Sequence, residues 1–591
     1  MAKRPKQKKA NHDILAKTPD SKATCSCAWI VLLLAVITFW VYWPSLRSDF
    51  VYDARREILE EGFVTSFSNL PSVLSLKVLG TNWMLKDRPG QILYLMFNAA
   101  IWGKEPFGYH LSSVLLQVAN VVLLFGLLRR LIIVEAIDCV GSASGKIQLA
   151  LAAVTLLFAL HPIAVESVAE VSYCATLLVT FFTLLALLMA TYFQPQNLRI
   201  ALLTGGIGVL CAFAAVISKE SGIAVAALLI VYWFLYRRQE AKAPWFWFLG
   251  AAMAVTAAFL AALFILTAPN RAHLGFLGGS FSQVFLIQPR LWVFMMGKLL
   301  WPMQLSADYT VEEIGSPTLP FALVVLLVVI LLQVWLICKS RMGALGVAIY
   351  WLGLVTVSNF VPLNRPLADR FYHLPLAGVA MQLLALLLMI VKSPRGFWVT
   401  MVILFGAILP LTFLTWEREK VFANELALWS DTVRVSPLSS LAHHNLGRVF
   451  FEQGRTDEAM VEYQKALAIS PDDAKAHYNL GVLLVEKGRV DEGVAEYQKA
   501  LAISPNLVEV YNNLGFIFLE KGHLDEAMAQ YRKASEINPN VAEVHNGLGA
   551  VLFQKGEIAE AMAQFQEALR LKPDYIEAQN NLAKLQTLRQ Q

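Results

Sequence analysis

The sequence predicts an all-α membrane protein, in which a polytopic transmembrane domain is followed by a solenoid of helical repeats. The 591-residue chain is 57% hydrophobic and only 16% charged, with a mean hydropathy of +0.53, whereas a soluble chain needs more charge to cover its surface. Apolar runs fill residues 28–416, and residues 417–591 are charged, amphipathic and repetitive. These observations separate a membrane domain from a soluble one.

The predicted parts are, in chain order, a basic cytoplasmic tail (1–27), a multi-span membrane domain (28–416) with its first external loop at 46–106, a half-repeat connector (417–439) and a repeat domain (440–591). The apolar run after the basic tail lacks a small-residue cleavage site, which predicts a retained first span rather than a signal peptide. Other basic residues cluster beside the spans, where topology explains them, so no nucleic-acid partner is predicted.

The six cysteines show no disulfide pattern, and none lies in the repeats. Cys25 and Cys27 resemble half of a zinc site, but no second pair follows them. No metal site is therefore predicted.

Eleven apolar runs are long enough to cross a bilayer, which takes about 20 residues. They start near Ala28, Gly108, Gln148, Ala175, Ile200, Gly222, Phe246, Leu319, Gly343, Leu374 and Phe397. A further run at 284–300 is interrupted by polar residues, so it can either cross the bilayer or lie at its surface. With a cytoplasmic N-terminus, eleven spans place five basic connectors inside, whereas a twelfth span would turn the last two of them outside. These connectors carry Arg129 and Arg130, Arg199, Arg237 and Arg238, Lys339 and Arg341, and Lys392 and Arg395.

We therefore predict eleven spans. Because this number is odd, the repeat domain is predicted on the extracytoplasmic side, together with the loops at 46–106, 161–172 and 361–373. The short loops and the retained basic tail favour a prokaryotic plasma membrane over the endoplasmic reticulum.

The C-terminal part repeats with a period of 34 residues, which is seen in its Leu-Gly pairs at 446, 480, 514 and 548. Small residues recur at Ala466, Ala500, Ala534 and Ala568, where two helices must approach closely. This pattern closely resembles the tetratricopeptide repeat. It predicts four full repeats (440–473, 474–507, 508–541 and 542–575), a capping helix, and a concave surface that binds a protein or peptide.

One column of amide side chains follows the first helices of the repeats, namely Asn445, Asn479, Asn513 and Asn581. Because an amide both donates and accepts hydrogen bonds, this column can hold an extended peptide by its backbone. The alternative is that these residues belong to the repeat consensus and serve packing alone. His443 and His444 are expected on the solvated face of the first repeat.

Polar motifs stand at predicted outer ends of the spans, at 49–57 (DFVYDARRE), 87–89, 106–110, 161–167 (HPIAVES), 218–220 (SKE), 369–375 (DRFYHLP) and 425–429. In this order they resemble the family of multi-span proteins with C-terminal tetratricopeptide repeats that is related to protein O-mannosyltransferases. The resemblance runs from Asp49 to the C-terminus. It implies the architecture of a C-type glycosyltransferase, which uses a polyprenyl-phosphate-linked sugar on the extracytoplasmic side.

The resemblance also implies roles for single residues. Asp53 matches the acidic residue of the first external loop that is thought to deprotonate the acceptor hydroxyl. Basic residues that stabilise the phosphate of the leaving lipid are expected at Arg88, Lys219, Arg365 and Arg370. The pocket for the sugar and the acceptor is expected at His161, Glu166, Glu220 and Tyr372. The sugar lipid is a substrate, and no metal or other cofactor is implied.

Two departures from the family pattern fall at candidate site positions. Ala54 stands where a second acidic residue usually follows the first, and the stretch 172–176 (SYCAT) stands where the family commonly has an Arg-x-Asp pair after Glu166. The alternative function is therefore a non-catalytic membrane scaffold that assembles partners through its repeats. A transporter ranks third, because the ionisable residues gather at one face and no internal symmetry or broken helices are evident.

Overall fold

The computed structural model describes residues 21–590 apart from 61, 76, 81–87, 136–141, 195, 238–249, 252, 255, 257, 259–279, 316, 359–366 and 391–392. Every regular element in this described part is a helix, which confirms the predicted all-α fold. The chain divides into two compact units, Met1–Ser436 and Pro437–Gln591.

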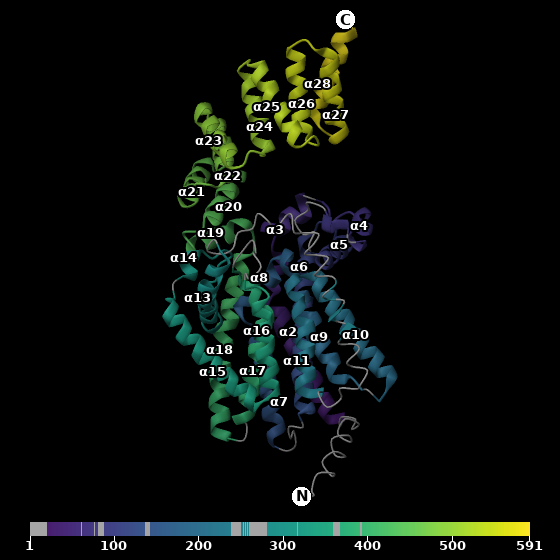
Figure 1. Ribbon diagram of the computed structural model, residues 1–591, viewed down its shortest axis with the longest axis vertical. Coiled ribbons are helices and arrows are strands. Elements are labelled where there is room, and N and C mark those ends of the chain that lie inside the picture. The colour runs from purple at the N-terminus through teal and green to yellow at the C-terminus, as the bar shows by residue number, and fades with distance from the viewer. Residues whose placement is uncertain are drawn as a thin grey trace. The chain divides into compact units, whose positions relative to one another are not determined.

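The first unit, here called the membrane unit, is a bundle of long helices (Figure 1). Its longer helices are α2 (Ser21–Val41), α5 (Pro89–Trp102), α6 (Pro106–Val134), α7 (Ser142–Ala159), α9 (Cys174–Tyr192), α10 (Leu198–Ser218), α11 (Ala224–Tyr232), α13 (Phe281–Leu300), α15 (Leu319–Lys339), α16 (Arg341–Val355), α17 (His373–Ile390), α18 (Pro394–Val421) and α19 (Glu425–Val435). Its short elements are η1 (Trp43–Arg47), α3 (Tyr52–Ala54), η2 (Arg55–Glu60), η3 (Phe67–Asn69), α4 (Leu70–Leu74), η4 (Lys77–Gly80), η5 (Pro162–Ala164), α8 (Val165–Ala169), η6 (Val171–Tyr173), η7 (Glu220–Ile223), η8 (Trp233–Arg237), α14 (Val311–Ile314) and η10 (Asp369–Tyr372).

Helix starts follow ordinary capping chemistry. Ser340 and Ser393 accept hydrogen bonds from backbone N–H groups in the first turns of α16 and α18, and Asn424 does the same for α19. Such caps satisfy donors that have no partner within the helix. Polar residues of the connectors therefore help to set where these three helices begin.

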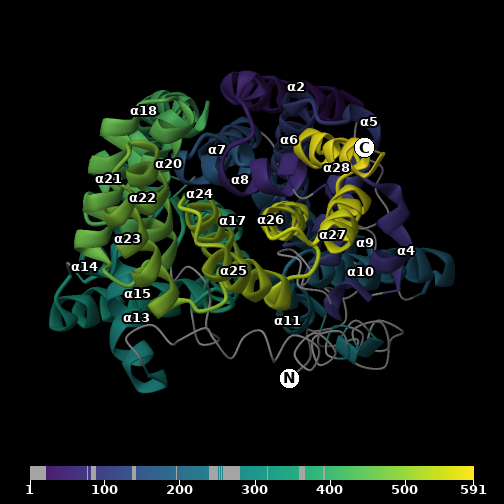
Figure 2. The same cartoon turned by 90° about the horizontal axis from the view of Figure 1, so that it is seen from above.

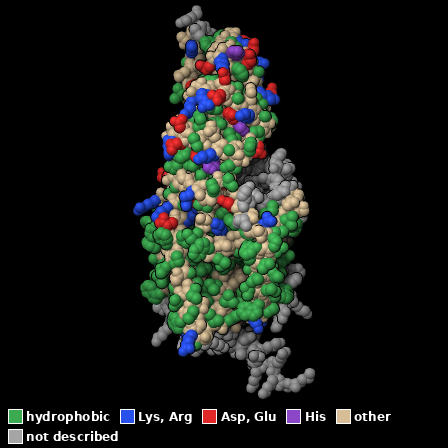
Figure 3. All heavy atoms as spheres, turned by 90° about the vertical axis from the view of Figure 1, so that its left-hand side faces the viewer, with side chains coloured by type: hydrophobic (Ala, Val, Ile, Leu, Met, Phe, Trp, Pro, Cys, Tyr) green, Lys and Arg blue, Asp and Glu red, His purple; other side chains and the backbone are tan. Residues whose placement is uncertain are grey.

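Among the described residues, seven helices are long and apolar enough to cross a membrane, and two bent helix pairs raise that number to nine. Hydrophobic side chains cover the face of this unit that is drawn in Figure 3. The run that starts at Gly343 forms α16, a shorter apolar helix of 15 residues, and the run at Phe246 lies largely outside the described residues. The ambiguous run forms α13, which is not among the candidate spans. Eleven spans therefore remain a prediction.

Helices α16 and α17 make a close contact through Gly346 and Gly378. A Cβ atom added at Gly378 would lie 2.6 Å from the carbonyl oxygen of Gly346, and one added at Gly346 would lie 2.9 Å from that of Gly378. In lipid, where no hydrophobic force drives helices together, small residues allow the backbone contact that holds them.

The two ends of the membrane unit differ in character. At one end, the guanidinium of Arg130 lies over the ring of Tyr192 at 4.5 Å, and Arg237 donates to the carbonyl of Phe193 at 2.8 Å. The elements of the first loop, α3 and α4, lie at the other end with α8, α14 and α19 (Figure 1). The basic connectors are thus separated from the polar motifs that the sequence marks as a site.

The second unit, the repeat unit, consists of paired helices that follow a curved path (Figure 2). They are α20 (Ser440–Glu452), α21 (Thr456–Ile469), α22 (Ala474–Glu486), α23 (Val490–Ile503), α24 (Val508–Glu520), α25 (Leu524–Ile537), α26 (Ala542–Gln554), α27 (Ile558–Leu571) and α28 (Ile576–Gln590). The glycine of each Leu-Gly pair faces an aromatic ring of the following helix, so that a Cβ atom at Gly481 would lie 2.6 Å from Tyr497. The repeat glycines therefore make room for the rings that join the two helices.

Replacing Gly481 by Val should destabilise the repeat unit by about 1 to 3 kcal/mol, because Tyr497 is buried and cannot move aside. The measurement is the temperature at which a protease begins to cut residues 437–591 of the purified protein. Gln498→Ala, at an exposed position on the second helix of the same repeat, is the control and should leave that temperature unchanged. Equal cleavage curves for the two variants would contradict the packing role of the glycine.

The expectation that His443 is solvated is wrong. Its side chain is buried, its Nε2 lies 3.0 Å from the carbonyl oxygen of Pro437, and its Nδ1 lies 2.5 Å from Glu462. His477 repeats this arrangement with Pro471 and Glu496. The side chain joins the proline turn to the second helix, a role that polarity alone does not reveal.

Candidate functional site

The first external loop is held against α19. Glu425 accepts a hydrogen bond from the backbone N–H of Tyr52 at 3.2 Å and forms an ion pair with Arg55 at 2.8 Å. The ring of Tyr52 meets that of Trp429 edge to face, with centroids 5.1 Å apart. Tyr52 has a φ of 48°, which is uncommon outside glycine and is sustained only by surrounding contacts. The backbone immediately before Asp53 is therefore fixed.

A continuous chain of polar contacts joins Asp53 to two other predicted site residues. The hydroxyl of Tyr173 donates to Oδ2 of Asp53 at 3.1 Å, and the guanidinium of Arg370 lies over the Tyr173 ring at 3.8 Å from its centroid. Arg370 in turn forms a buried ion pair with Glu166, which also accepts from the Arg370 backbone N–H at 2.8 Å. The structure thus gathers Asp53, Arg370 and Glu166 around Tyr173.

Lys219 adds a second cation beside Arg370. Both lie over the ring of Phe371, at 5.0 Å for Lys219 and 5.2 Å for Arg370, and the Lys219 amine donates to Thr176 at 3.1 Å. Lys219 lies in the turn between two spans, where burial, followed by the charge of Arg88, lowers the pKa of its amine to about 7. Near neutral pH the Lys219 side chain is therefore present both as the charged ammonium and as the neutral amine.

Two further predicted residues pair with each other. Arg88 lies 3.5 Å from Glu220, and both side chains are partly exposed. The fields of Arg88, Glu220, Arg370 and Glu166 all act on Lys219. These predicted residues therefore form one charged cluster.

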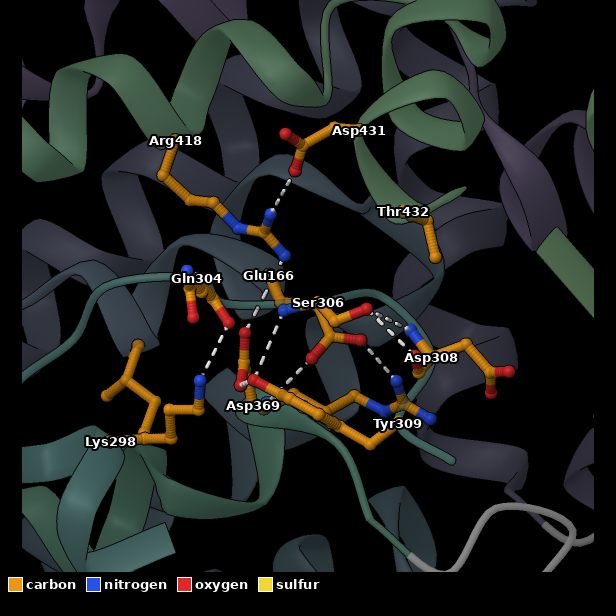
Figure 4. Close-up of polar contacts among 12 residues, drawn as sticks. Glu166, Lys298, Gln304, Ser306, Asp308, Tyr309, Asp369, Arg418, Asp431 and Thr432 are labelled. Atoms are coloured by element: carbon orange, nitrogen blue, oxygen red, sulfur yellow. Dashed lines mark hydrogen bonds and ion pairs between the residues drawn. The ribbon is translucent and has the colours of Figure 1, made fainter. Parts of the chain in front are cut away.

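A second network holds the turn that carries Arg370 (Figure 4). Arg418, on α18, reaches Asp369 at 3.7 Å and Asp431, on α19, at 3.0 Å. The hydroxyl of Tyr309 donates to the other oxygen of Asp369 at 2.6 Å. One arginine thus connects α18 and α19 to the turn beside the charged cluster.

A narrow pocket lies beside these groups. Four aromatic side chains and two carboxylates contribute to its wall, namely Tyr52, Tyr173, Phe422, Trp429, Glu166 and Glu170. Within the described residues, no group of three or more His, Cys, Asp or Glu side chains is arranged to hold a metal ion.

Other predicted residues take different positions. Both ring nitrogens of His161 bond to backbone, at 2.9 Å from the Leu299 carbonyl and 3.2 Å from the Ile163 N–H. Tyr372 is fully buried, and neither it nor His161 lines the pocket. Arg365 lies outside the described residues. These positions neither support nor contradict a catalytic or binding role for His161, Tyr372 or Arg365, so those roles remain predictions.

The asparagine column of the repeats is engaged within the solenoid. The amide nitrogen of Asn445 bonds to Leu441 of its own helix at 2.8 Å. The corresponding nitrogens of Asn479, Asn513 and Asn581 bond to His444, Tyr497 and Asn546. A peptide that takes these donors must replace existing bonds, and the clamp stays a prediction.

Sequence reasoning missed three residues that organise the site: Tyr173, Glu170 and Arg418. Tyr173 was part of a stretch that departs from the family pattern, so it carried no positive signal. Arg418 follows a long apolar run and reads as the start of a soluble segment, although it is buried. The signal that could have identified Arg418 is its place within the end of a membrane-spanning helix, where an ionisable residue is uncommon and often functional.

Comparison with known proteins connects this geometry to a family. The curated Protein O-mannosyl-transferase F38B6.6 of Caenorhabditis elegans is 25% identical over 470 residues, which are 76% of this chain and 64% of the nematode protein. This chain is a homologue of the protein O-mannosyl-transferases. Protein O-mannosyl-transferase Tmtc3 of Drosophila melanogaster is 28% identical over 221 residues, 34% of this chain and 23% of the fly protein. The predicted resemblance is confirmed, and the chain spans less than two thirds of these O-mannosyl-transferases.

The repeats are confirmed separately. A family model described as "TPR repeat" matches residues 447–488, 483–522, 515–556 and 549–587. The solved structure of PilF from Pseudomonas aeruginosa is 30% identical over 26% of this chain and 69% of that chain, with a TM-score of 0.25. The family-model match confirms the predicted tetratricopeptide repeats.

Proposed function

We propose that this protein is a membrane glycosyltransferase that moves a sugar from a polyprenyl-phosphate donor to a hydroxyl group of a protein. The observation that carries the proposal is the short chain of contacts from Asp53 through Tyr173 to the Glu166–Arg370 pair. It brings a carboxylate and two cations, Arg370 and Lys219, together at one end of the membrane unit. The names of the homologous transferases support the same reaction class.

In the proposed reaction, Asp53 accepts the proton of the acceptor hydroxyl while the hydroxyl oxygen attacks C1 of the sugar. The bond between C1 and the phosphate oxygen breaks, and its electron pair leaves with the polyprenyl phosphate. Arg370, Lys219 and Arg88 stabilise the negative charge on that phosphate. Tyr173 orients the Asp53 carboxylate by its hydrogen bond and is a positioning residue.

The acceptor is proposed to be a Ser or Thr side chain of a protein that the concave surface of the repeats holds. We place the site and the repeats on the extracytoplasmic side. The gathering of the basic connectors, including Arg130 and Arg237, at the opposite end of the membrane unit supports this orientation.

The test is transfer of a radiolabelled sugar into endogenous protein, from a panel of polyprenyl-phosphate donors, in membranes that contain or lack this protein. Label that enters protein only when this chain is present supports the proposal. Equal labelling in both membranes, with every donor in the panel, overturns it.

The pH dependence of donor binding should reveal Lys219. Only the ammonium form of Lys219 attracts phosphate, and in the protein without bound donor its pKa is about 7. The KM for the donor should therefore rise about tenfold between pH 6 and pH 8, as the amine loses its proton. Lys219→Arg keeps its charge over this range, so its KM should stay level. A level KM in the wild type, or the same rise in the arginine variant, would exclude this role for Lys219.

A non-catalytic scaffold is the second candidate. Ala54 and the uncharged stretch 172–176 favour it, because charged residues of the family pattern are missing there. In the structure Thr176, which belongs to this uncharged stretch, accepts a hydrogen bond from the amine of Lys219. A scaffold would bind its partners through the repeats while its membranes transfer no sugar.

A further inference from the structure

An exposed stripe of side chains runs along α24 in the third repeat. Glu509, Asn513, Phe516 and Glu520 follow one another at intervals of four, three and four residues, which places them on one side of the helix. Phe516 is 55% exposed, and both glutamates are exposed as well. In Figure 2, α22 and α24 lie on the inner side of the curved path of the repeats. The stripe therefore belongs to the concave surface, where it presents an aromatic ring to solvent.

The preceding repeat extends this surface. Val482 and Glu486 of α22 occupy the positions that Phe516 and Glu520 have in α24, one period earlier in the sequence. Val482 is partly exposed, and Glu486 is exposed. These four residues, which lie toward the C-terminal ends of α22 and α24, are here called the Phe516 face.

The two helices are joined beside the Phe516 face. Asn513 of α24 donates a hydrogen bond to the hydroxyl of Tyr497 at 3.2 Å. Burial raises the pKa of this hydroxyl to about 12, and the negative charge of Glu486 adds to the rise. An amide of α24 and a carboxylate of α22 thus act on the same hydroxyl group, so the two helices contribute to one continuous surface.

The carboxylates of the Phe516 face lack ion-pair partners. Other carboxylates beside the first helices are paired, as in Lys487–Asp457, Lys521–Asp491, Lys555–Asp525 and Arg448–Glu452. Among the described residues, Glu486 and Glu520 form no ion pair. Residues 437–591 also contain more Asp and Glu than Lys and Arg, although the whole chain carries a formal charge of +5. The Phe516 face therefore attracts cations from outside the chain.

The Phe516 ring is a second feature that suits a cation. Two other aromatic rings of the first helices are covered by cations of the chain: Arg455 lies over Phe450 at 4.1 Å, and Lys584 lies over Phe553 at 5.5 Å. No cation lies over Phe516 in the part of the chain that the structure describes. Because the face of an aromatic ring attracts ammonium and guanidinium groups, Phe516 offers the same contact to another molecule.

We propose that the Phe516 face binds an extended segment of the acceptor protein through its Lys or Arg side chains, with one cation over Phe516 and others paired with Glu486 and Glu520. The inference rests on the proposed function, and it adds the chemistry of the segment that the repeats hold. Lys475 and Glu509 stand at the opposite ends of the two helices, where their charges offset each other. The excess of negative charge therefore lies beside the Phe516 ring, and an acidic segment would be repelled there.

The test measures Kd by fluorescence anisotropy for two labelled synthetic peptides, on the purified full-length protein in nanodiscs of neutral lipid. The peptides have the same length and a Ser-Ala background, and they carry either lysines or glutamates at the same positions. The lysine peptide should bind at least about tenfold more tightly. Its Kd should rise about threefold in Phe516→Ala, and about fivefold when Glu486→Gln is combined with Glu520→Gln.

The matched control combines Glu557→Gln with Glu560→Gln. It removes the same charge from exposed positions at the start of α27, a second helix that does not contribute to the Phe516 face, so the Kd should stay at the wild-type value. The charge reversal Glu486→Lys with Glu520→Lys should make the protein prefer the glutamate peptide, which loss of folding cannot mimic. Equal Kd values for the two peptides in the wild type, or equal weakening by the control, would overturn the proposal.

These outcomes are separable from those of the transfer assay. A preference for the lysine peptide that depends on Glu486 and Glu520, in a protein that transfers no sugar, would refute the transferase and keep the Phe516 face as a docking surface. Sugar transfer by a protein without this preference would keep the transferase and refute the docking surface.

Discussion

Replacing Asp53 by Asn is expected to lower kcat for sugar transfer at least about a hundredfold, the contribution of a positioned general base. Asparagine cannot take the proton of the acceptor hydroxyl, yet its amide oxygen still accepts the Tyr173 hydrogen bond, so the loop should keep its place. The measurement is the initial rate of transfer from a saturating lipid-linked donor in proteoliposomes of matched protein content.

Asp49→Asn is the control for this prediction. Asp49 belongs to the same loop, and its backbone N–H donates to the Ala423 carbonyl at 3.0 Å, but no role in the reaction is assigned to its carboxylate. Its variant should transfer sugar at the wild-type rate. Tyr173→Phe leaves the base in place without its hydrogen bond, so its loss should be smaller than that of Asp53→Asn. An Asp53→Asn enzyme with more than half of the wild-type rate would eliminate Asp53 as the base.

Replacing Arg370 by Met is expected to cause the largest loss of stability, about 3 to 5 kcal/mol, because it leaves the charge of Glu166 buried without compensation. Glu166 is 2% exposed and receives both the guanidinium and the backbone N–H of Arg370. The stacking of Arg370 on Tyr173 is lost at the same time. The measurement is Tm in detergent, followed by the loss of monomeric protein on size-exclusion chromatography.

Lys420→Met serves as the matched control, since the Lys420–Glu417 pair is solvent-exposed and such pairs contribute about 0 to 1 kcal/mol. The double variant Glu166→Leu with Arg370→Met removes both charges and should regain much of the lost Tm. If Arg370→Met and Lys420→Met have the same Tm, the Arg370–Glu166 ion pair does not stabilise this site.

The sequence was sufficient for the repeats, because a 34-residue period is visible in single residues such as Gly481 and Ala500. It also placed Asp53, Glu166 and Arg370 at one end of the bundle through the positive-inside rule. It could not predict the contacts that join these three residues. Tyr173 bonds to Asp53 across 120 positions, and the Arg370–Glu166 contact spans 204, so neither follows from local pattern.

Hydropathy had a similar limit for the membrane unit. It located the apolar runs, but it does not indicate that 145–159 and 162–169 are bent by 47° about their break, or that α16 is only 15 residues long. Burial of Arg418 and Glu170 depends on which helices surround them. The residue type alone predicts that arginine and glutamate face water, whereas the packing of the surrounding helices buries Arg418 and Glu170.

The bond from Arg55 to Glu425 joins positions that are 370 residues apart, and this separation imposes an order on biosynthesis. At roughly 5 to 20 residues per second, a ribosome needs roughly 20 to 75 s to travel from the first partner to the second. Throughout that interval the left-handed backbone at Tyr52 lacks its contacts with Glu425 and Trp429 of α19. The contacts of the first loop with α19 are thus completed only after the helices from α2 to α18 have been synthesised, and a chain interrupted before Glu425 never acquires them.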